Sequence, residues 1–299
     1  MRSIYVFGIF EASPGKTTLA SALLRGLNDR GLDIAPLKPR SGHNCWYQYD
    51  SFMRCKEEGR LYCEDIIKLR GASVCRLPYE ILNPLDTLIA PLDAGWFLKS
   101  DRIRELYLRH GDEFTKFILE RYTTAEGEGH SSIYCVNEIN EERALGDDEY
   151  IQRVTRGVRV YRIKSSEEWN RIYNRYARRS VESCAERINA EHENLLIESF
   201  SDEVYLTPGV RYDVAIGVGP GIAVLYPPDK LERVLSIKTR DESMKTLKAS
   251  KVIPLIKPDR IIDIPPLSKE EIGDYDLLST RMEELIDEVH KALEGVLRP

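Results

Sequence analysis

The chain has 299 residues, of which 42% are apolar, so it is long enough to bury the core of one large domain or two small ones. Its formal net charge of -6 argues against a general nucleic-acid-binding protein, and no apolar run approaches the length that crosses a membrane. We therefore expect a cytoplasmic protein.

The first predicted elements are a strand, a glycine-containing turn and a helix. Residues 3–7 are β-rich, and between Leu19 and Leu27 apolar residues recur at helical spacing. The turn between them predicts a phosphate-binding loop, because strand, glycine turn, Gly-Lys-Thr and helix follow one another. The residues expected to bind nucleotide there are Gly8, Ser13, Pro14, Gly15, Lys16, Thr17 and Thr18.

The chemistry of this loop follows from its residue types. Backbone N–H groups and the helix N-terminus attract phosphate, Lys16 would reach the β- and γ-phosphates, and Thr17 would hold Mg²⁺. The first glycine of the usual spacing would fall at Phe10, so the loop is stretched back to Gly8. The alternative interpretation is an ordinary strand-to-helix turn with an exposed lysine.

The rest of the chain alternates between strand and helix patterns. The predicted strands cover 33–38, 133–136, 158–163, 194–198, 212–218, 222–226, 251–256 and 260–264. The predicted helices cover 17–30, 61–69, 101–122, 165–188 and 278–297. This alternation predicts an α/β fold with a mostly parallel central sheet flanked by helices. The second strand delivers residues 38–42 to the carboxyl edge of that sheet, where such folds bind ligands.

Several of these segments together resemble one family. Residues 8–17, Leu37-Lys38-Pro39-Arg40-Ser41-Gly42, Glu64-Asp65 and Asn83-Pro84 resemble dethiobiotin synthetase, a P-loop NTPase family related to the ATP-binding domain of the cobyric and cobyrinic acid synthases. The resemblance continues at Leu196-Ile197-Glu198-Ser199 and at Ile264-Pro265-Pro266-Leu267. It implies a single P-loop α/β domain over 1–299 that carries an inserted α+β segment at 99–165.

The resemblance also implies roles for individual residues. By motif match, the catalytic residues are Lys16 and Lys38; the Mg²⁺ ligands are Thr17, Asp65 and Glu198; the residues near the nucleotide base are Pro265, Pro266 and Leu267; and the acceptor contacts are Arg40 and Ser41. Oxygen ligands on separate elements suit Mg²⁺ independently of the resemblance. Three simpler interpretations stay open: Asp65 as a solvated helix acid, Glu198 as a surface acid after a strand, and Lys38 as an exposed lysine.

The activity implied by the family is phosphoryl transfer from Mg-ATP, or GTP, to a carboxylate or carbamate, followed by ligation or ring closure. Its partners would be the nucleotide, a small carboxylate substrate and a second copy in a homodimer. Residues 199–202 replace the family's glycines after the glutamate, so a biotin precursor is not implied. Two alternatives are a nucleotide-dependent switch or partner-binding ATPase of the ParA and MinD kind, and a regulatory nucleotide-binding module without turnover.

An arginine cluster follows the acidic segment 138–149, and tyrosines lie between its members. Its residues are Arg153, Arg156, Arg159, Arg162, Arg171, Arg175, Arg178 and Arg179, with Tyr161, Tyr173 and Tyr176. One interpretation is a surface for an anionic partner or substrate. The other is a solvated face that is paired with the acids of 138–149.

Overall fold

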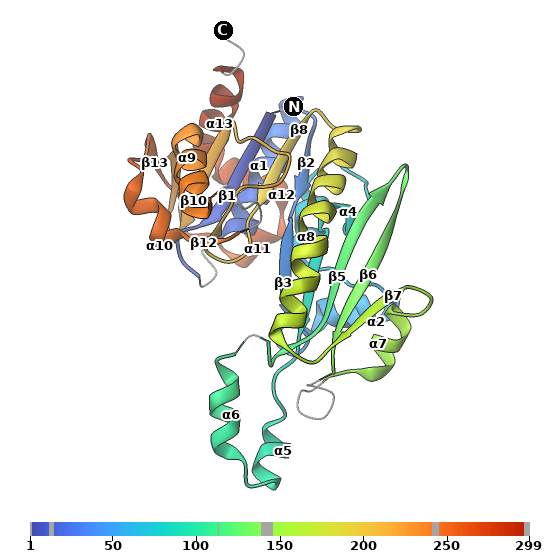
Figure 1. Cartoon of the computed structure of the whole chain (residues 1–299). Helices are drawn as coiled ribbons and strands as arrows, with labels where there is room; N and C mark the ends of the chain where they lie inside the picture. The colour runs from blue at the N-terminus through green and yellow to red at the C-terminus, as the bar shows by residue number, and fades with distance from the viewer. Residues whose placement is uncertain (1, 12–14, 113, 139–145, 241–244, 296–299) are drawn as a thin grey trace. The chain divides into compact units, whose positions relative to one another are not determined.

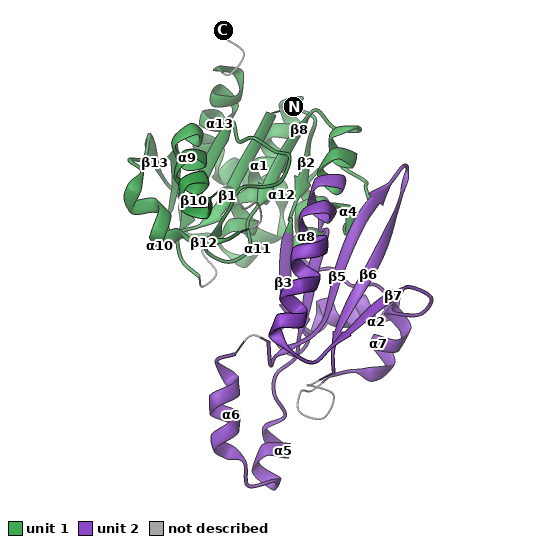
Figure 2. Ribbon diagram, in the orientation of Figure 1, with its two compact units in different colours: residues 1–39, 65–82, 184–299 green, residues 40–64, 83–183 purple. Residues whose placement is uncertain are grey.

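The computed structural model describes residues 2–11, 15–112, 114–138, 146–240 and 245–295. They form two compact units, shown in different colours in Figure 2. Unit 1 comprises 1–39, 65–82 and 184–299, and unit 2 comprises 40–64 and 83–183. A single domain with an insertion at 99–165 was expected instead. The second unit begins much earlier, because the strand at 40–44 pairs with the strand at 85–89.

Unit 1 is built on a six-stranded sheet in the order β13-β11-β10-β1-β8-β2 (Figure 1). Strands β10, β1, β8 and β2 are parallel, whereas β11 and β13 run antiparallel to their neighbours. The sheet is therefore mixed, and the expectation of a mostly parallel sheet holds only for these four strands. The strands are β1 (Arg2–Gly8), β2 (Ile34–Leu37), β8 (Asn194–Glu198), β10 (Val214–Gly219), β11 (Ile222–Tyr226) and β13 (Arg260–Asp263).

The helices of unit 1 bury apolar faces against this sheet and against one another. Leu19, Leu23 and Leu27 of α1 are buried at the predicted spacing, and α1 packs against β1, β2, β8, α12 and α13. The elements are α1 (Lys16–Asp29), α3 (Glu64–Ala72), α4 (Tyr79–Leu82), α9 (Pro228–Thr239), α10 (Ala249–Val252), η2 (Ile253–Leu255), α11 (Lys269–Gly273), α12 (Tyr275–Arg281) and α13 (Glu283–Gly295), with the short pair β9 (Glu203–Val204) and β12 (Leu247–Lys248).

Unit 2 contains a five-stranded mixed sheet in the order β3-β4-β5-β6-β7. Its strands are β3 (Arg40–Asn44), β4 (Leu85–Ile89), β5 (Phe117–Glu126), β6 (Gly129–Asn137) and β7 (Arg159–Ile163). Its helices are α2 (Tyr49–Glu58), α5 (Ala94–Lys99), α6 (Ile103–His110), α7 (Asp148–Val154) and most of α8 (Ser166–Asn189). Phe52 of α2 packs edge to face against Tyr150 of α7, and Trp169 of α8 stacks on Phe117 of β5.

Two predicted elements are wrong. The helix expected at 101–122 is only α6, and β5 begins at Phe117, because the helix ends at Gly111 and the following residues pair with β4 and β6. The strand expected at 251–256 is α10 followed by a 3₁₀ turn. Pro254 has no N–H group for a strand ladder, which explains that difference.

The six cysteines are all buried free thiols. Within the described ranges, no helix combines the length and the hydrophobicity needed to cross a membrane.

Candidate functional site

The site lies where three parallel strands of unit 1 end at the same sheet edge. Pairing of β1 with β8 puts Val6 opposite Glu198, and pairing of β2 with β8 puts Leu37 opposite Ile197. Lys38 directly follows β2, so its side chain starts beside the end of β8. The apolar strands fix the backbone, and the polar residues sit at their carboxyl ends, as is usual for ligand sites of α/β folds.

Glu198 is the centre of the side-chain contacts. Its Oε1 accepts a hydrogen bond from Thr17 Oγ1 at 2.9 Å and from Lys38 Nζ at 2.6 Å. Lys38 Nζ also lies 2.9 Å from Asp65 Oδ2 on α3. The side chains of Lys38 and Glu198 are 3% and 1% exposed, whereas that of Asp65 is 36% exposed. The structure therefore brings together Thr17, Lys38, Asp65 and Glu198, from four segments of the chain.

The electrostatics of this cluster are those of charges held away from water. Burial raises the pKa of Glu198, and the charge of Lys38 only partly opposes this effect. For Asp65 burial is also the largest single influence and raises the pKa, but Lys38, Lys68 and Thr17 together outweigh it and leave the pKa of Asp65 lowered. Burial lowers the pKa of Lys16, while Glu198 opposes the shift and Lys38 adds to it. Lys16 therefore belongs to the same electrostatic cluster.

Helix α1 starts beside these side chains. Its N-cap is Gly15, whose φ of +91° lies in the left-handed region that glycine adopts without strain, and among the described residues no side chain caps the helix. Lys16, the first helical residue, is 8% exposed. The first turn therefore presents backbone N–H groups and a lysine, which is the arrangement that binds phosphate at a helix N-terminus.

The residues present fit a bound Mg²⁺. Glu198 Oε2 is fully buried and has no hydrogen-bond partner among the described residues, so a carboxylate oxygen is left for a further ligand. Thr17, Asp65 and Glu198 offer the hard oxygen ligands that Mg²⁺ prefers. The described ranges contain no cluster of three or more His, Cys, Asp or Glu side chains that could hold a metal. A cation here would therefore also need oxygens from water or phosphate, as Mg²⁺ does in nucleotide sites.

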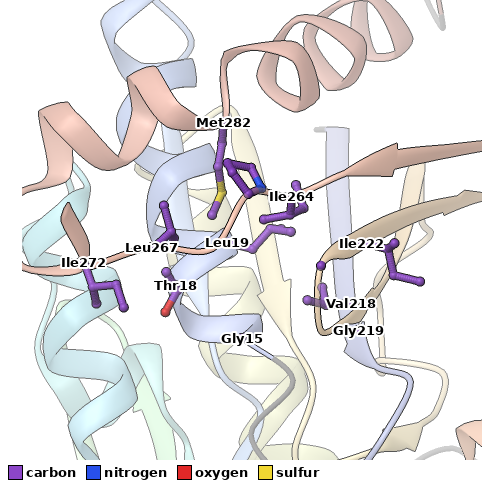
Figure 3. Close-up of a pocket in the computed structure, with 12 residues that line it drawn as sticks. Gly15, Thr18, Leu19, Val218, Gly219, Ile222, Ile264, Leu267, Ile272 and Met282 are labelled. Carbon is purple, nitrogen blue, oxygen red and sulfur yellow. The ribbon is translucent and has the colours of Figure 1, made fainter. Parts of the chain in front are cut away.

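An apolar cavity of about 190 Å³ adjoins the start of α1 (Figure 3). Gly15 and Thr18 line it on one side, and the β10–β11 turn and the segment after β13 close it. Its other lining residues are Leu19, Val218, Gly219, Gly221, Ile222, Ile264, Pro265, Leu267, Ile272 and Met282. The lining would suit a flat apolar ring of a ligand bound beside the N-terminus of α1.

The predicted nucleotide-binding residues are only partly gathered here. Gly15, Thr18, Pro265 and Leu267 line the cavity, whereas Pro266 is exposed. Gly8 closes β1, where it pairs with Val218. Ser13 and Pro14 lie outside the described residues.

The two predicted acceptor residues belong to unit 2 and differ in accessibility. Ser41 is 1% exposed, and its hydroxyl is 2.6 Å from Asp86 Oδ1 and 3.0 Å from Asn83 Oδ1. This hydroxyl is therefore engaged inside the core of unit 2. Arg40 is half-buried, and its guanidinium lies 5.4 Å from the ring centroid of Tyr173.

Sequence reasoning missed part of the site. Asp202 is 8% exposed, contributes to the electrostatic environment of Lys16, and pairs with Lys248 Nζ at 2.6 Å. Ile272 and Met282 reach the cavity from α11 and from the junction of α12 and α13. The one sequence feature that pointed to this region was the Gly219-Pro220-Gly221 turn. Glycines there indicate that the backbone closely approaches another group, but they do not indicate which side chains line the cavity.

Comparison of the chain with models of known families, with curated proteins and with solved structures finds no match.

Proposed function

We propose that unit 1 binds Mg-ATP, or Mg-GTP, and transfers its terminal phosphoryl group to a carboxylate or carbamate of a small substrate, as dethiobiotin synthetase-like proteins do. The observation that carries this proposal is the contact of Thr17 and Lys38 with one oxygen of buried Glu198, next to the uncapped start of α1. A charged cluster of this kind is expensive to bury, and such clusters are typical of functional sites.

Each residue has a defined task in this proposal. Backbone N–H groups of α1 and Lys16 bind the phosphates, and the apolar cavity accepts the base. Thr17, Asp65 and Glu198 would hold Mg²⁺, which supplies positive charge to the phosphate oxygens when it is bound. Lys38 stabilises negative charge on the transferred group, and its two carboxylate contacts fix its position.

The role of Lys38 separates an enzyme from a nucleotide-dependent switch. Phosphoryl transfer to a carboxylate brings two anions together, which costs about 4 kcal/mol at about 4 Å and an effective dielectric near 20. A lysine between them offsets much of this repulsion, and most strongly in the transition state. A switch has to hold its nucleotide but has no such acceptor to approach.

The test compares ATP affinity with ADP formation in the presence of a panel of small mono- and dicarboxylic acids. We expect Lys38→Met to keep Mg-ATP affinity within a few-fold and to lower acceptor-dependent turnover about a hundredfold or more. The matched control is Lys291→Met, which removes an exposed lysine whose partner is Glu288. Turnover that no acid stimulates, or that Lys38→Met leaves intact, would discard the transferase and favour the switch.

A further inference from the structure

The arginine cluster of the sequence lies on α7, the turn after it, β7 and α8 of unit 2, and it is not used by the proposed function. Residues 153–179 contain nine Lys or Arg against two Asp or Glu, although the whole chain carries -6. Among the described residues, pairing with the acidic segment accounts for Arg162 and Lys164 alone. Glu138 pairs with Arg162 and Lys164, and Arg153 donates to the backbone carbonyls of Lys56 and Glu57. The rest of the cluster therefore needs another explanation.

Three exposed arginines form a stripe along α8 at intervals of four residues: Arg171, Arg175 and Arg179. Like charges at this spacing destabilise a helix. Arg171 lies 3.8 Å from Glu168, and within the described ranges Arg175 and Arg179 have no carboxylate partner. The same helix also contains a stabilising ion pair of the usual spacing, between Arg178 and Glu182 four residues later, at 2.7 Å. Helix stability therefore does not account for the stripe.

Two tyrosines extend the stripe to β7, the edge strand of the sheet. The hydroxyl oxygens of Tyr161 and Tyr176 lie 2.5 Å apart, and the guanidinium of Arg175 is 5.3 Å from the ring centroid of Tyr176. Arg159 interacts with both hydroxyls. The hydrogen bond from Tyr176 and the nearby guanidinium groups lower the pKa of Tyr161. One hydroxyl donates to the other, so the pair keeps one O–H donor for an external acceptor.

The residue types indicate the chemistry of the partner. Eight of the nine basic residues are arginines, whose planar guanidinium groups match phosphate and carboxylate oxygens. Arg171 and Arg179 are about 12 Å apart along the helix, a span that suits successive charges of a polymer better than one small anion. Half-exposed tyrosine rings beside arginine also offer faces on which unpaired bases stack.

A second copy of this chain fits this surface less well. The acidic helix α13 could face this surface from a second copy, but several of its carboxylates already pair with basic side chains of the same chain. Asp287 lies 2.5 Å from Arg30, and Glu288 pairs with Arg260 and Lys291. The arginine stripe is therefore complementary to an external polyanion.

We propose that Arg159, Arg171, Arg175 and Arg179, with Tyr161 and Tyr176, form a surface of unit 2 that binds the phosphate backbone of single-stranded nucleic acid without sequence preference. The net charge of the whole chain is negative and argues against such binding, but the local charge of this surface is positive. This proposal does not depend on the nucleotide binding proposed for unit 1.

The experiment measures fluorescence anisotropy of a labelled 15-nucleotide oligo-dT with the full chain at several salt concentrations. Four arginine–phosphate contacts predict a slope of log K against log salt of about -3. Arg159→Gln/Arg175→Gln should halve this slope to about -1.5 and weaken binding at least tenfold at low salt. The control is Arg178→Gln/Glu182→Gln, which removes an existing ion pair on the same helix at no change of net charge and should leave affinity and slope unchanged.

Three results would overturn the proposal. One is an unchanged affinity of the arginine double variant when its circular dichroism matches that of the native chain. Another is equal or tighter binding of the corresponding duplex, which shelters its bases. The third is equal affinity for a poly-glutamate peptide of similar length, which would assign the surface to an acidic protein instead.

Discussion

Replacing Lys38 by methionine tests the charge balance of the site by itself, without nucleotide. The lysine contacts two carboxylates and is 3% exposed, so water screens its charge little. An ion pair at 2.6 Å and an effective dielectric near 20 amounts to about 6 kcal/mol. The variant no longer buries a charged ammonium group, and the free energy saved in this way offsets part of the lost ion-pair energy. We expect the variant to be less stable by about 3–5 kcal/mol at pH 7, the usual result of leaving a buried charge without its partner.

The pH dependence of this deficit follows from Glu198. Its folded-state pKa is already raised by burial, and removing Lys38 removes the main opposing influence. An acid with a raised folded pKa destabilises the fold when it is ionised. The deficit should therefore be complete above that raised pKa and shrink as the pH falls toward the ordinary value of glutamate. Asp65 also makes the stability difference shrink in acid. Its pKa is lowered in the unsubstituted chain, where Lys38 is present, and the stability that its ionised form contributes there is lost when the carboxylate is protonated.

Urea denaturation of the native chain, Lys38→Met and Lys38→Met/Glu198→Gln at pH 7 and pH 5 would measure these effects. The double variant should regain most of the lost stability at pH 7, because its buried amide needs no counter-charge. A Lys38→Met chain as stable as the native one at pH 7, or a deficit of equal size at both pH values, would refute the charge-balance argument.

The remaining predictions concern ligand binding. Lys16→Ala should abolish Mg-ATP binding in calorimetry while leaving the circular dichroism unchanged, and unaltered affinity would reject the phosphate loop. Glu198→Gln should lower Mg²⁺-dependent turnover far more than nucleotide affinity, because it keeps a hydrogen-bond acceptor but loses the charge; an equal loss of both would contradict its role at the metal. Leu267→Trp should fill the cavity and weaken ATP binding but not tripolyphosphate binding, whereas Leu277→Trp, at a half-exposed leucine on α12, should change neither. Equal ATP affinity of both tryptophan variants would place the base elsewhere.

Much of unit 1 could be predicted because the hydrophobic pattern of each element is typical of either a strand or a helix. Strands β1 and β8 are continuous apolar runs, and α1 repeats its leucines at helical spacing. The resemblance to dethiobiotin synthetase also indicated that Lys38, Asp65 and Glu198 meet, and the structure places these three side chains in contact around Lys38. Their roles are still predictions. The parallel register of β2 and β8 brings Lys38 beside Glu198, and the first turn of α3 supplies Asp65.

Unit 2 could not be predicted in the same way, because its core is unusually polar. Strand β3 reads Arg-Ser-Gly-His-Asn, without one apolar residue, and is held by buried partners that only the fold provides. Ser41 and His43 both contact Asp86 on the neighbouring strand. On β5, buried Arg121 donates to the backbone carbonyls of Leu61 and Asn83. Hydropathy patterns describe strands that bury apolar side chains, so they misassigned β5 and missed β3.

The burial of the Glu198 carboxyl group indicates why the site is better explained by function than by stability. Its raised pKa means that the folded chain would be more stable with the carboxyl neutral, and Lys38 only reduces this cost. Apolar residues of similar volume usually replace a buried ion pair without loss of stability. A phosphate and a divalent cation, by contrast, would interact favourably with Lys16, Lys38 and the buried Glu198 Oε2, which has no hydrogen-bond partner among the described residues. Under the proposed function a charged ligand would balance this cluster, and the stability of Lys38→Met without nucleotide measures how much of that balance the protein supplies itself.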